Sequence, residues 1–270
     1  MNRLPDLVRE IAAILRFDQP AWGTRRIAQV LARLGLNVSR TSVQRIVRQK
    51  PRRRPPTSVP AKPRKRHKGI RPKRPHHVWF IDLTTVKTCF GFRSFRVAAI
   101  IDAFSRAVVA IKAFADEPSA REIVHLVRRG IDSAGEGPTH LITNQENQFT
   151  AKRFRRYLRR RGVRQRFGAI RSFLSVAVIE RLWRSMKEEL RGALLHVVGV
   201  RSMDVAVRAW ARWYRMERPH QGLGGRTPNE VARARPTRRR RRTDGDRWWL
   251  ERRNLDGQHH LPVYRLRRAG

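Results

Sequence analysis

The sequence predicts an α/β domain with a mixed sheet, preceded by a small all-α domain. From residue 77, three apolar segments separated by turn residues follow one another, as in an antiparallel meander. Beyond them, helical and extended patterns alternate, which indicates a sheet flanked by helices. In the first fifty residues, apolar side chains recur only at helical spacing, which predicts short helices without strands.

The N-terminal region is expected to form three helices. Leu7, Ile11 and Leu15 share one face of a first helix over roughly residues 4–16. A second apolar stripe ends at Gly35, and Ser39 is a favourable N-cap for a third helix. The outward face of this third helix is polar and basic, and its members are Arg40, Thr41, Gln44, Arg45 and Arg48.

Two short helices joined by a Gly-containing turn, the second one basic outside, match the helix-turn-helix pattern. Arg and Gln can hydrogen-bond base edges in the major groove, while Thr and further Arg can hold phosphates. A generic three-helix bundle shows the same stripes, so both interpretations stay open. We expect a DNA-binding domain over residues 1–50 and a basic, Pro-rich linker over residues 51–76, which has too few apolar side chains for a core.

The charge balance indicates a phosphate polymer as partner. The 270 residues include 62 Lys plus Arg against 21 Asp plus Glu, a formal charge of +41. Such an excess attracts nucleic acid. A membrane is the weaker alternative, since no segment approaches the ~20 apolar residues of a span. Cys89 is the single cysteine, which excludes an internal disulfide and a thiolate zinc cage. The N-terminus has no signal-peptide pattern and a single cysteine fits a reducing compartment, so we expect a cytoplasmic protein.

The central domain is predicted to span residues 77–234. The expected strands are residues 78–86, 95–101, 107–111, 140–143 and 163–167. The expected helices are residues 119–130, 154–158 and 177–190. This order predicts a mixed sheet of five strands with flanking helices.

Three positions in this domain are candidates for chemistry. Asp82 interrupts an apolar strand, Asn144 follows the short fourth strand, and Glu180 begins the exposed face of the last helix. Phosphodiester chemistry with Mg²⁺ requires two or three carboxylates that converge on one point. The other interpretation of Glu180 is a surface ion pair with Arg184 and Lys187, which follow on the same helix face.

Several segments carry a family resemblance when they are taken together. They are residues 22–27, 79–84, 101–106, 141–150, 177–181 with Lys187, and 213–221 with 227–228. Thirty-five residues lie between Asn144 and Glu180, the spacing of the last two catalytic acids in that family. By these motifs the chain resembles the insertion-sequence transposases of the retroviral-integrase superfamily, of the DDE type.

The resemblance implies a ribonuclease-H-like core and polynucleotidyl transfer on double-stranded DNA by a homo-oligomer. It implies a catalytic set of Asp82, position 144 (here Asn144) and Glu180. Asp82 and Glu180 would be ligands of Mg²⁺ or Mn²⁺, with two ions in active relatives. Arg184 and Lys187 would position phosphates.

The chain departs from the family pattern at Asn144, where the family has its second catalytic Asp. An amide oxygen can contact a metal but brings no negative charge, so the change should weaken metal binding. Glu146, two residues later, is a candidate substitute. Two functions follow: a transposase-type protein for DNA integration with impaired catalysis, or an inactive DNA-binding relic or regulator of transposition. A basic packaging protein is a third interpretation, which the paired motifs disfavour.

Residues 235–270 are expected to form a basic tail. Residues 238–242 are an unbroken run of arginines suited to a nucleic-acid backbone. Two aromatic-containing segments on either side of Asp256-Gly257 suggest a short β-hairpin. Its aromatic side chains could stack on bases or fill a small core.

Overall fold

The computed structural model describes residues 6–47, 70–88, 91–168, 173–234, 248–256 and 258–268. These residues divide into two compact units. The first contains three N-terminal helices and the stem of a C-terminal hairpin. The second contains the described residues between Ile70 and Thr237 together with the hairpin tip, Arg253–Val263. Each unit has its own set of buried apolar side chains.

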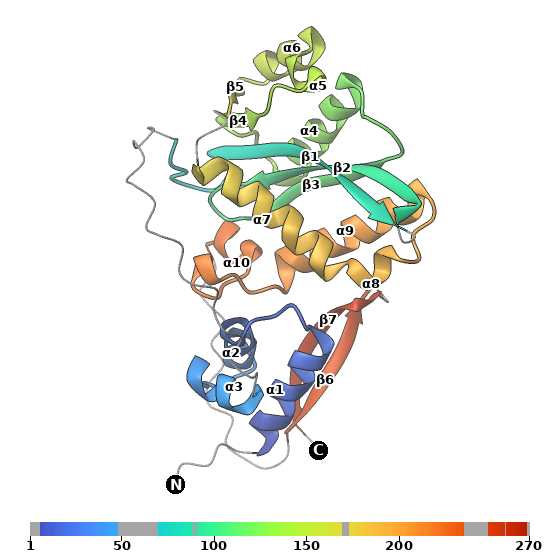
Figure 1. Ribbon diagram of the computed structural model, residues 1–270. Coiled ribbons are helices and arrows are strands. Elements are labelled where there is room, and N and C mark those ends of the chain that lie inside the picture. The colour runs from blue at the N-terminus through green and yellow to red at the C-terminus, as the bar shows by residue number, and fades with distance from the viewer. Residues whose placement is uncertain are drawn as a thin grey trace, which may run out of the picture. The chain divides into compact units, whose positions relative to one another are not determined.

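The first unit is built on helices α1 (Asp6–Asp18), α2 (Thr24–Arg33) and α3 (Arg40–Val47) (Figure 1). Their apolar stripes meet in a small core, whose fully buried members are Ile11, Leu15, Ile27, Leu31 and Val43. At the start of α3, the hydroxyl of Ser39 accepts a hydrogen bond of 3.0 Å from the backbone N–H of Ser42. This is the N-cap that the sequence predicts.

The C-terminal strands β6 (Trp248–Leu255) and β7 (Gln258–Arg268) form a two-stranded sheet. In the stem, the carboxylate of Asp18 accepts hydrogen bonds from Arg252 Nε at 2.7 Å and from the Tyr264 hydroxyl at 2.9 Å. The Tyr264 ring is buried and lies edge-on to Trp22, with ring centroids 6.4 Å apart. Tyr264 is therefore a core residue of the first unit.

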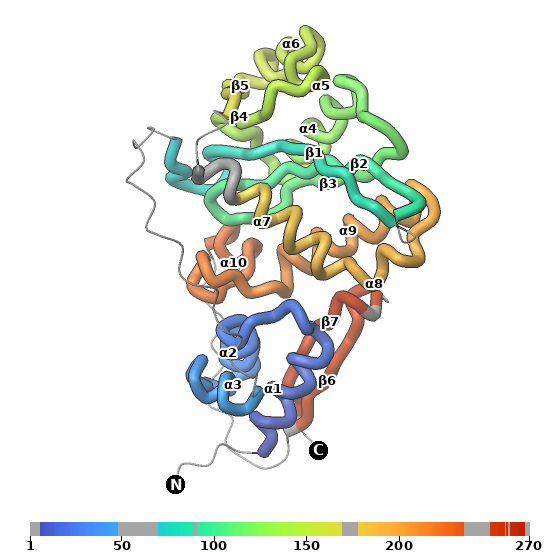
Figure 2. The backbone as a smooth tube through the Cα atoms, in the orientation of Figure 1, coloured from blue at the N-terminus to red at the C-terminus, as the bar shows by residue number. Residues whose placement is uncertain are grey.

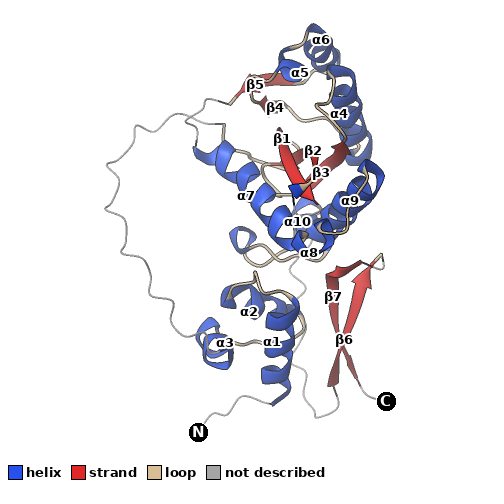
Figure 3. Ribbon diagram, turned by 45° about the vertical axis from the view of Figure 1, so that its right-hand side comes forward, coloured by secondary structure: helices blue, strands red, loops and turns tan. Residues whose placement is uncertain are grey.

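The second unit contains a five-stranded sheet with the order β3-β2-β1-β4-β5 (Figure 3). Its strands are β1 (Val78–Thr88), β2 (Arg93–Asp102), β3 (Val108–Phe114), β4 (His140–Thr143) and β5 (Arg164–Phe167). The first three pair antiparallel, whereas β4 and β5 continue the sheet in parallel with β1. The predicted mixed sheet of five strands is confirmed.

Helices cover both faces of this sheet (Figure 1). On one face, α4 (Ala120–Ala134) and α6 (Lys152–Arg160) bury apolar side chains against β1. On the other face lie α7 (Phe173–Glu189) and α9 (Val200–Met216). The shorter helices are α5 (Asn147–Thr150), α8 (Arg191–Leu194), η2 (Gln221–Leu223) and α10 (Pro228–Ala232). None of the helices in the described part of the chain is long and apolar enough to cross a bilayer.

The turn after β2 depends on a buried carboxylate. Asp102 is fully buried and accepts hydrogen bonds from the backbone N–H of Ser105 at 2.8 Å and from that of His76 at 3.1 Å. The Ser105 hydroxyl is a further donor to it. Arg106, the next residue, has a φ of 64°, which completes the turn. The Asp and Ser of this motif therefore have a structural role.

A buried ion pair fixes the segment that follows α9. Arg218 Nε donates to Glu189 Oε1 at 2.7 Å, and the two side chains are only 4% and 2% exposed. Trp210 Nε1 donates to the other Glu189 oxygen at 3.0 Å, and Arg218 also donates to the Ser185 hydroxyl at 3.0 Å. These bonds satisfy the buried charges and join the end of α7 to α9.

Breaking this pair should destabilise the second unit. For Arg218→Met we expect a loss of ~3–5 kcal/mol in the free energy of unfolding, because Glu189 would keep a buried charge without its cation. Urea unfolding measures the loss. Arg208→Met is the matched control, since Arg208 pairs with Asp204 at 2.7 Å in a partly exposed position and should contribute only about 0–1 kcal/mol. Equal losses in the two variants would contradict this account.

Candidate active site

Asp82 lies in the middle of β1, the central strand of the sheet. Successive side chains of a strand point to opposite faces. Ile81 and Leu83 are buried in the core beneath α4, so Asp82 points to the other face, where α7 lies. It is half-buried there. The chain thus holds a carboxylate at the centre of the sheet, on the face where α7 packs against β1.

Both carboxylate oxygens of Asp82 accept a hydrogen bond. Trp183 Nε1, on α7, donates to Oδ2 at 3.0 Å, and Asn144 Nδ2 donates to Oδ1 at 3.2 Å. Burial raises the pKa of Asp82, and the Trp183 hydrogen bond opposes that rise. The negative charge of Glu146 raises the pKa further. The hydrogen bond from Trp183 therefore offsets part of the effect of burial on the pKa of Asp82.

Asn144 follows β4 directly, which places it beside Asp82 because β1 and β4 are parallel and Phe80 pairs with Ile142. Its amide group contacts two carboxylates at once. Nδ2 donates to Asp82 and also to Glu146 Oε1, the second bond being 2.8 Å long. Asn144 Oδ1 accepts from the backbone N–H of Glu146 at 3.1 Å. A backbone N–H can only donate, so this bond fixes which end of the amide faces the carboxylates.

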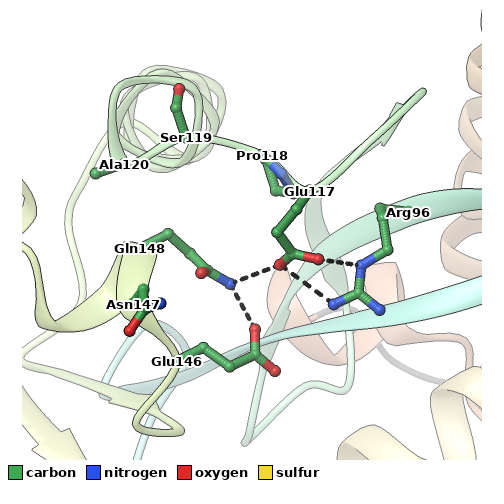
Figure 4. Close-up of a pocket in the computed structure, with 8 residues that line it drawn as sticks. All are labelled: Arg96, Glu117, Pro118, Ser119, Ala120, Glu146, Asn147 and Gln148. Carbon is green, nitrogen blue, oxygen red and sulfur yellow. Dashed lines mark hydrogen bonds and ion pairs between the residues drawn. The ribbon is translucent and has the colours of Figure 1, made fainter.

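The hydrogen-bond chain continues into an open hollow of about 560 Å³ beside the start of α4 (Figure 4). Gln148 Nε2 donates to Glu146 and, at 3.2 Å, to Glu117 Oε1. Arg96 Nε pairs with Glu117 Oε2 at 2.6 Å. Carboxylates and amide groups therefore alternate along this network, in the order Asp82, Asn144, Glu146, Gln148 and Glu117, and Arg96 ends it. Each amide NH₂ holds two acids in place.

Helix α7 carries three of the predicted site residues, Glu180, Arg184 and Lys187. Its backbone runs beside β1 (Figure 2), and Lys187 Nζ donates to the Thr84 hydroxyl at 2.9 Å. Burial lowers the pKa of Lys187. Glu180 and Arg184 are exposed, and within the described residues neither side chain forms a hydrogen bond or an ion pair. The structure thus joins Asp82 to Asn144 and leaves the carboxylate of Glu180 outside that network.

The residues predicted to contact DNA from the N-terminal unit lie on α3. Arg40, Thr41, Gln44 and Arg45 are all exposed on that helix, on the face opposite buried Val43. Arg48 lies outside the described residues. The surface expected to meet DNA is therefore open to solvent in the first unit.

The donor set around Asp82 does not fit a pair of divalent cations. Oxygen ligands are required, with enough negative charge to balance two ions. Here the group between Asp82 and Glu146 is the NH₂ of Asn144, which presents hydrogen atoms to both acids. No cluster of three or more His, Cys, Asp or Glu side chains able to hold a metal occurs among the described residues. The assignment of Asp82 and Glu180 as metal ligands therefore stays a prediction.

The central part of the chain matches protein-family models. Two models, each described as an integrase core domain, match residues 72–172 and 161–228. Together they cover residues 72–228, more than half of the chain. The chain belongs to the integrase core family.

Relatives of this integrase core protein include two proteins named as transposases for insertion sequence element IS986/IS6110, from Mycobacterium tuberculosis and Mycobacterium bovis. Each is 26% identical over 259 residues, which cover 89% of this chain and 91% of the relative. A chain in the solved simian T-cell lymphotropic virus intasome, in complex with PP2A regulatory subunit B56 gamma, matches 96% of this chain and 88% of its own length. Its TM-score is 0.53 at 16% identity. That likeness confirms the ribonuclease-H-like fold.

Within the integrase core, sequence patterns missed three members of the site. Trp183 was expected only in the apolar stripe of its helix, because its N–H group does not alter that pattern. Glu117 and Gln148 are 31 positions apart in the chain, and no motif joins them. Two usable signals existed: Gln148 lies in the segment 141–150 that carries the family resemblance, and Trp183 lies three residues after Glu180, so the two are neighbours on a helix surface.

The Trp183 hydrogen bond can be tested through the pKa of Asp82. Trp183→Phe removes a donor that opposes the effect of burial, so the pKa of Asp82 should rise further. A folded-state pKa above the unfolded value means that stability is lost as the pH rises through it. The variant should therefore lose more stability than the wild type over that pH range. NMR titration of the Asp82 carboxyl carbon measures the pKa directly.

Trp213→Phe is the control, since Trp213 Nε1 donates to the Pro262 carbonyl, away from Asp82. The pKa of Asp82 should be the same in this variant as in the wild type. An unchanged or lower pKa in Trp183→Phe would show that the indole N–H does not stabilise the Asp82 carboxylate.

Proposed function

We propose that this integrase core protein binds double-stranded DNA and serves DNA integration of the transposase type, with strand cleavage and transfer impaired by Asn144. The family assignment, the relatives named as transposases and the charge of +41 support the DNA-integration part. The exposed basic face of α3 supports a DNA contact by the first unit, in a helix-turn-helix arrangement. Arg40, Thr41, Gln44 and Arg45 would make this contact, with Arg48 continuing the same face.

One observation carries the impairment. The amide of Asn144 donates to Asp82 and to Glu146, and so takes the place between two acids where an active site needs a cation. A carboxylate at this position would repel both acids unless a cation balanced the charge. The amide stabilises the same arrangement without one. The metal-free network is therefore the favoured state of this chain.

We propose roles for the remaining residues on the same basis. Asp82 and Glu180 would supply oxygen ligands to Mg²⁺ or Mn²⁺ once Asn144 is replaced by an acid. The bound ions would polarise the phosphodiester and activate the attacking oxygen. Lys187 and Arg184, one turn apart on α7, would hold DNA phosphates. A homo-oligomer on DNA and a bacterial cytoplasmic location complete the proposal.

The second candidate function is a DNA-binding relic or regulator of transposition without catalysis. The same amide bridge favours it, since the bridge stabilises the fold and leaves the cation site incomplete. The two candidates differ in whether the wild-type chain retains any strand transfer.

Strand transfer into plasmid DNA, with Mg²⁺ or Mn²⁺, tests both candidates. We expect Asn144→Asp to raise the rate at least about tenfold, equivalent to ~1.4 kcal/mol of transition-state stabilisation. Asn147→Asp is the matched control, because Asn147 is an exposed amide three residues later and the same charge is added there. Weak wild-type activity supports the impaired transposase, and activity only in Asn144→Asp supports the relic. Equal, robust activity in the wild type and in Asn144→Asp would contradict both.

A further inference from the structure

The segment that contains α6 and β5 has only positively charged side chains among its ionised residues. Of the seventeen residues from Lys152 to Gly168, nine are Lys or Arg and none is Asp or Glu. Phe154 and Leu158 anchor α6 in the core, and the basic side chains of the helix are exposed. A merely solvated surface usually mixes the two signs of charge. This segment instead presents cations alone.

A groove lies between α6 and β5, with a volume of about 800 Å³. Leu158 and Val163, both buried, contribute its apolar lining. The cations that line it are Lys152, Arg155, Arg156 and Arg159 from α6 and Arg164 from β5. Lys152 and Arg159 are seven residues apart, which corresponds to ~10 Å along the helix axis.

The surroundings of these cations contain few carboxylates among the residues that the structure describes. Arg155 Nε donates to the backbone carbonyl of Thr150 at 2.8 Å, which fixes that side chain. Across the part of the chain that the structure describes, Arg156, Arg159 and Arg164 form no ion pair with a carboxylate. An arginine cluster without acids is electrostatically unfavourable in isolation and is stabilised by a phosphate polymer.

The groove reaches the end of the sheet at which the candidate active site lies. Phe167, at the end of β5, pairs with Thr143 of β4, and Asn144 is the next residue. Neighbouring strands are ~4.8 Å apart, so β5 lies about 10 Å from the strand that carries Asp82. Gln165 fixes this edge by donating to the Thr143 hydroxyl at 3.1 Å and to the Phe149 carbonyl at 2.9 Å. The groove opens on the α6 face and Asp82 points to the α7 face, so a polymer bound in the groove would reach the site by passing around β5, which is the edge strand of the sheet.

We infer that the groove between α6 and β5 binds the phosphate backbone of duplex DNA whose adjoining segment reaches the Asp82 site. The inference rests on the proposed function, which supplies DNA as the substrate class. Arg156, Arg159 and Arg164 contact the phosphates, and Arg155 and Lys152 flank them.

The experiment compares two charge-matched variants of the full chain. Arg156→Gln/Arg159→Gln removes two cations of the groove, and Arg153→Gln/Arg160→Gln removes two exposed cations of the same helix that do not line it. Binding of a mixed-sequence DNA duplex is followed by fluorescence anisotropy over a series of salt concentrations. The logarithm of the binding constant falls linearly with the logarithm of the salt concentration, with a slope of ~0.9 in magnitude for each phosphate that the protein neutralises. We expect this slope to be smaller by about 1.8 in the groove variant, and by less than a third of that amount in the control variant.

Thermal unfolding of both variants verifies that the fold is intact. Equal salt-dependence slopes in the two variants would overturn the inference, because total charge and not the groove would then determine binding. An unchanged slope in the groove variant would also overturn it, because the groove would then contact no phosphate. A groove variant that binds RNA duplex more weakly while binding DNA as the wild type does would overturn the choice of DNA. A wild-type chain that binds no duplex DNA would refute the proposed function itself, which is a different outcome.

Discussion

A carboxylate in the central strand of a sheet needs hydrogen-bond donors from the elements that cover it, because burying an unsatisfied charge is costly. Asp82 obtains one donor from α7 and one from the loop after β4. The first bond fixes the covering helix against β1. The second places Asn144, and through it Glu146, beside the same acid. Asp82 is therefore the side chain at which β1, α7 and the loop after β4 are joined.

The motif residues of the family separate into two groups by their surroundings. Asp102 and Arg218 are buried, and their charged groups are paired within the fold. Their role is therefore structural. Asp82, Asn144 and Glu146 are only partly buried and lie at an open surface. An amide at position 144 removes a charge from between two acids, which favours folding without a cation. The amide at position 144 is therefore compatible with a fold that keeps the buried pairs of Asp102 and Arg218.

The sequence predicts the sheet well, because strand periodicity and turn residues are local signals. The segment 140–143 is found with the predicted bounds, and β1 extends two residues beyond the predicted Val86. The four-residue helices α5 and α8 are too short for a periodic pattern to indicate. The site is harder to predict: the bond between Gln148 and Glu117 depends on how α5 packs against the start of α4, and the exposure of Glu180 depends on the rotation of α7 about its axis.

The cation-dependent shift in the melting temperature tests most directly whether the Asn144 amide stands where a cation would bind. A ligand that binds only the folded state raises that temperature according to its concentration and affinity. With excess EDTA, Asn144→Asp should melt below the wild type, because three acids then repel one another. On addition of Mn²⁺, Asn144→Asp should be stabilised strongly and the wild type little. A wild-type shift as large as that of the variant would contradict the account.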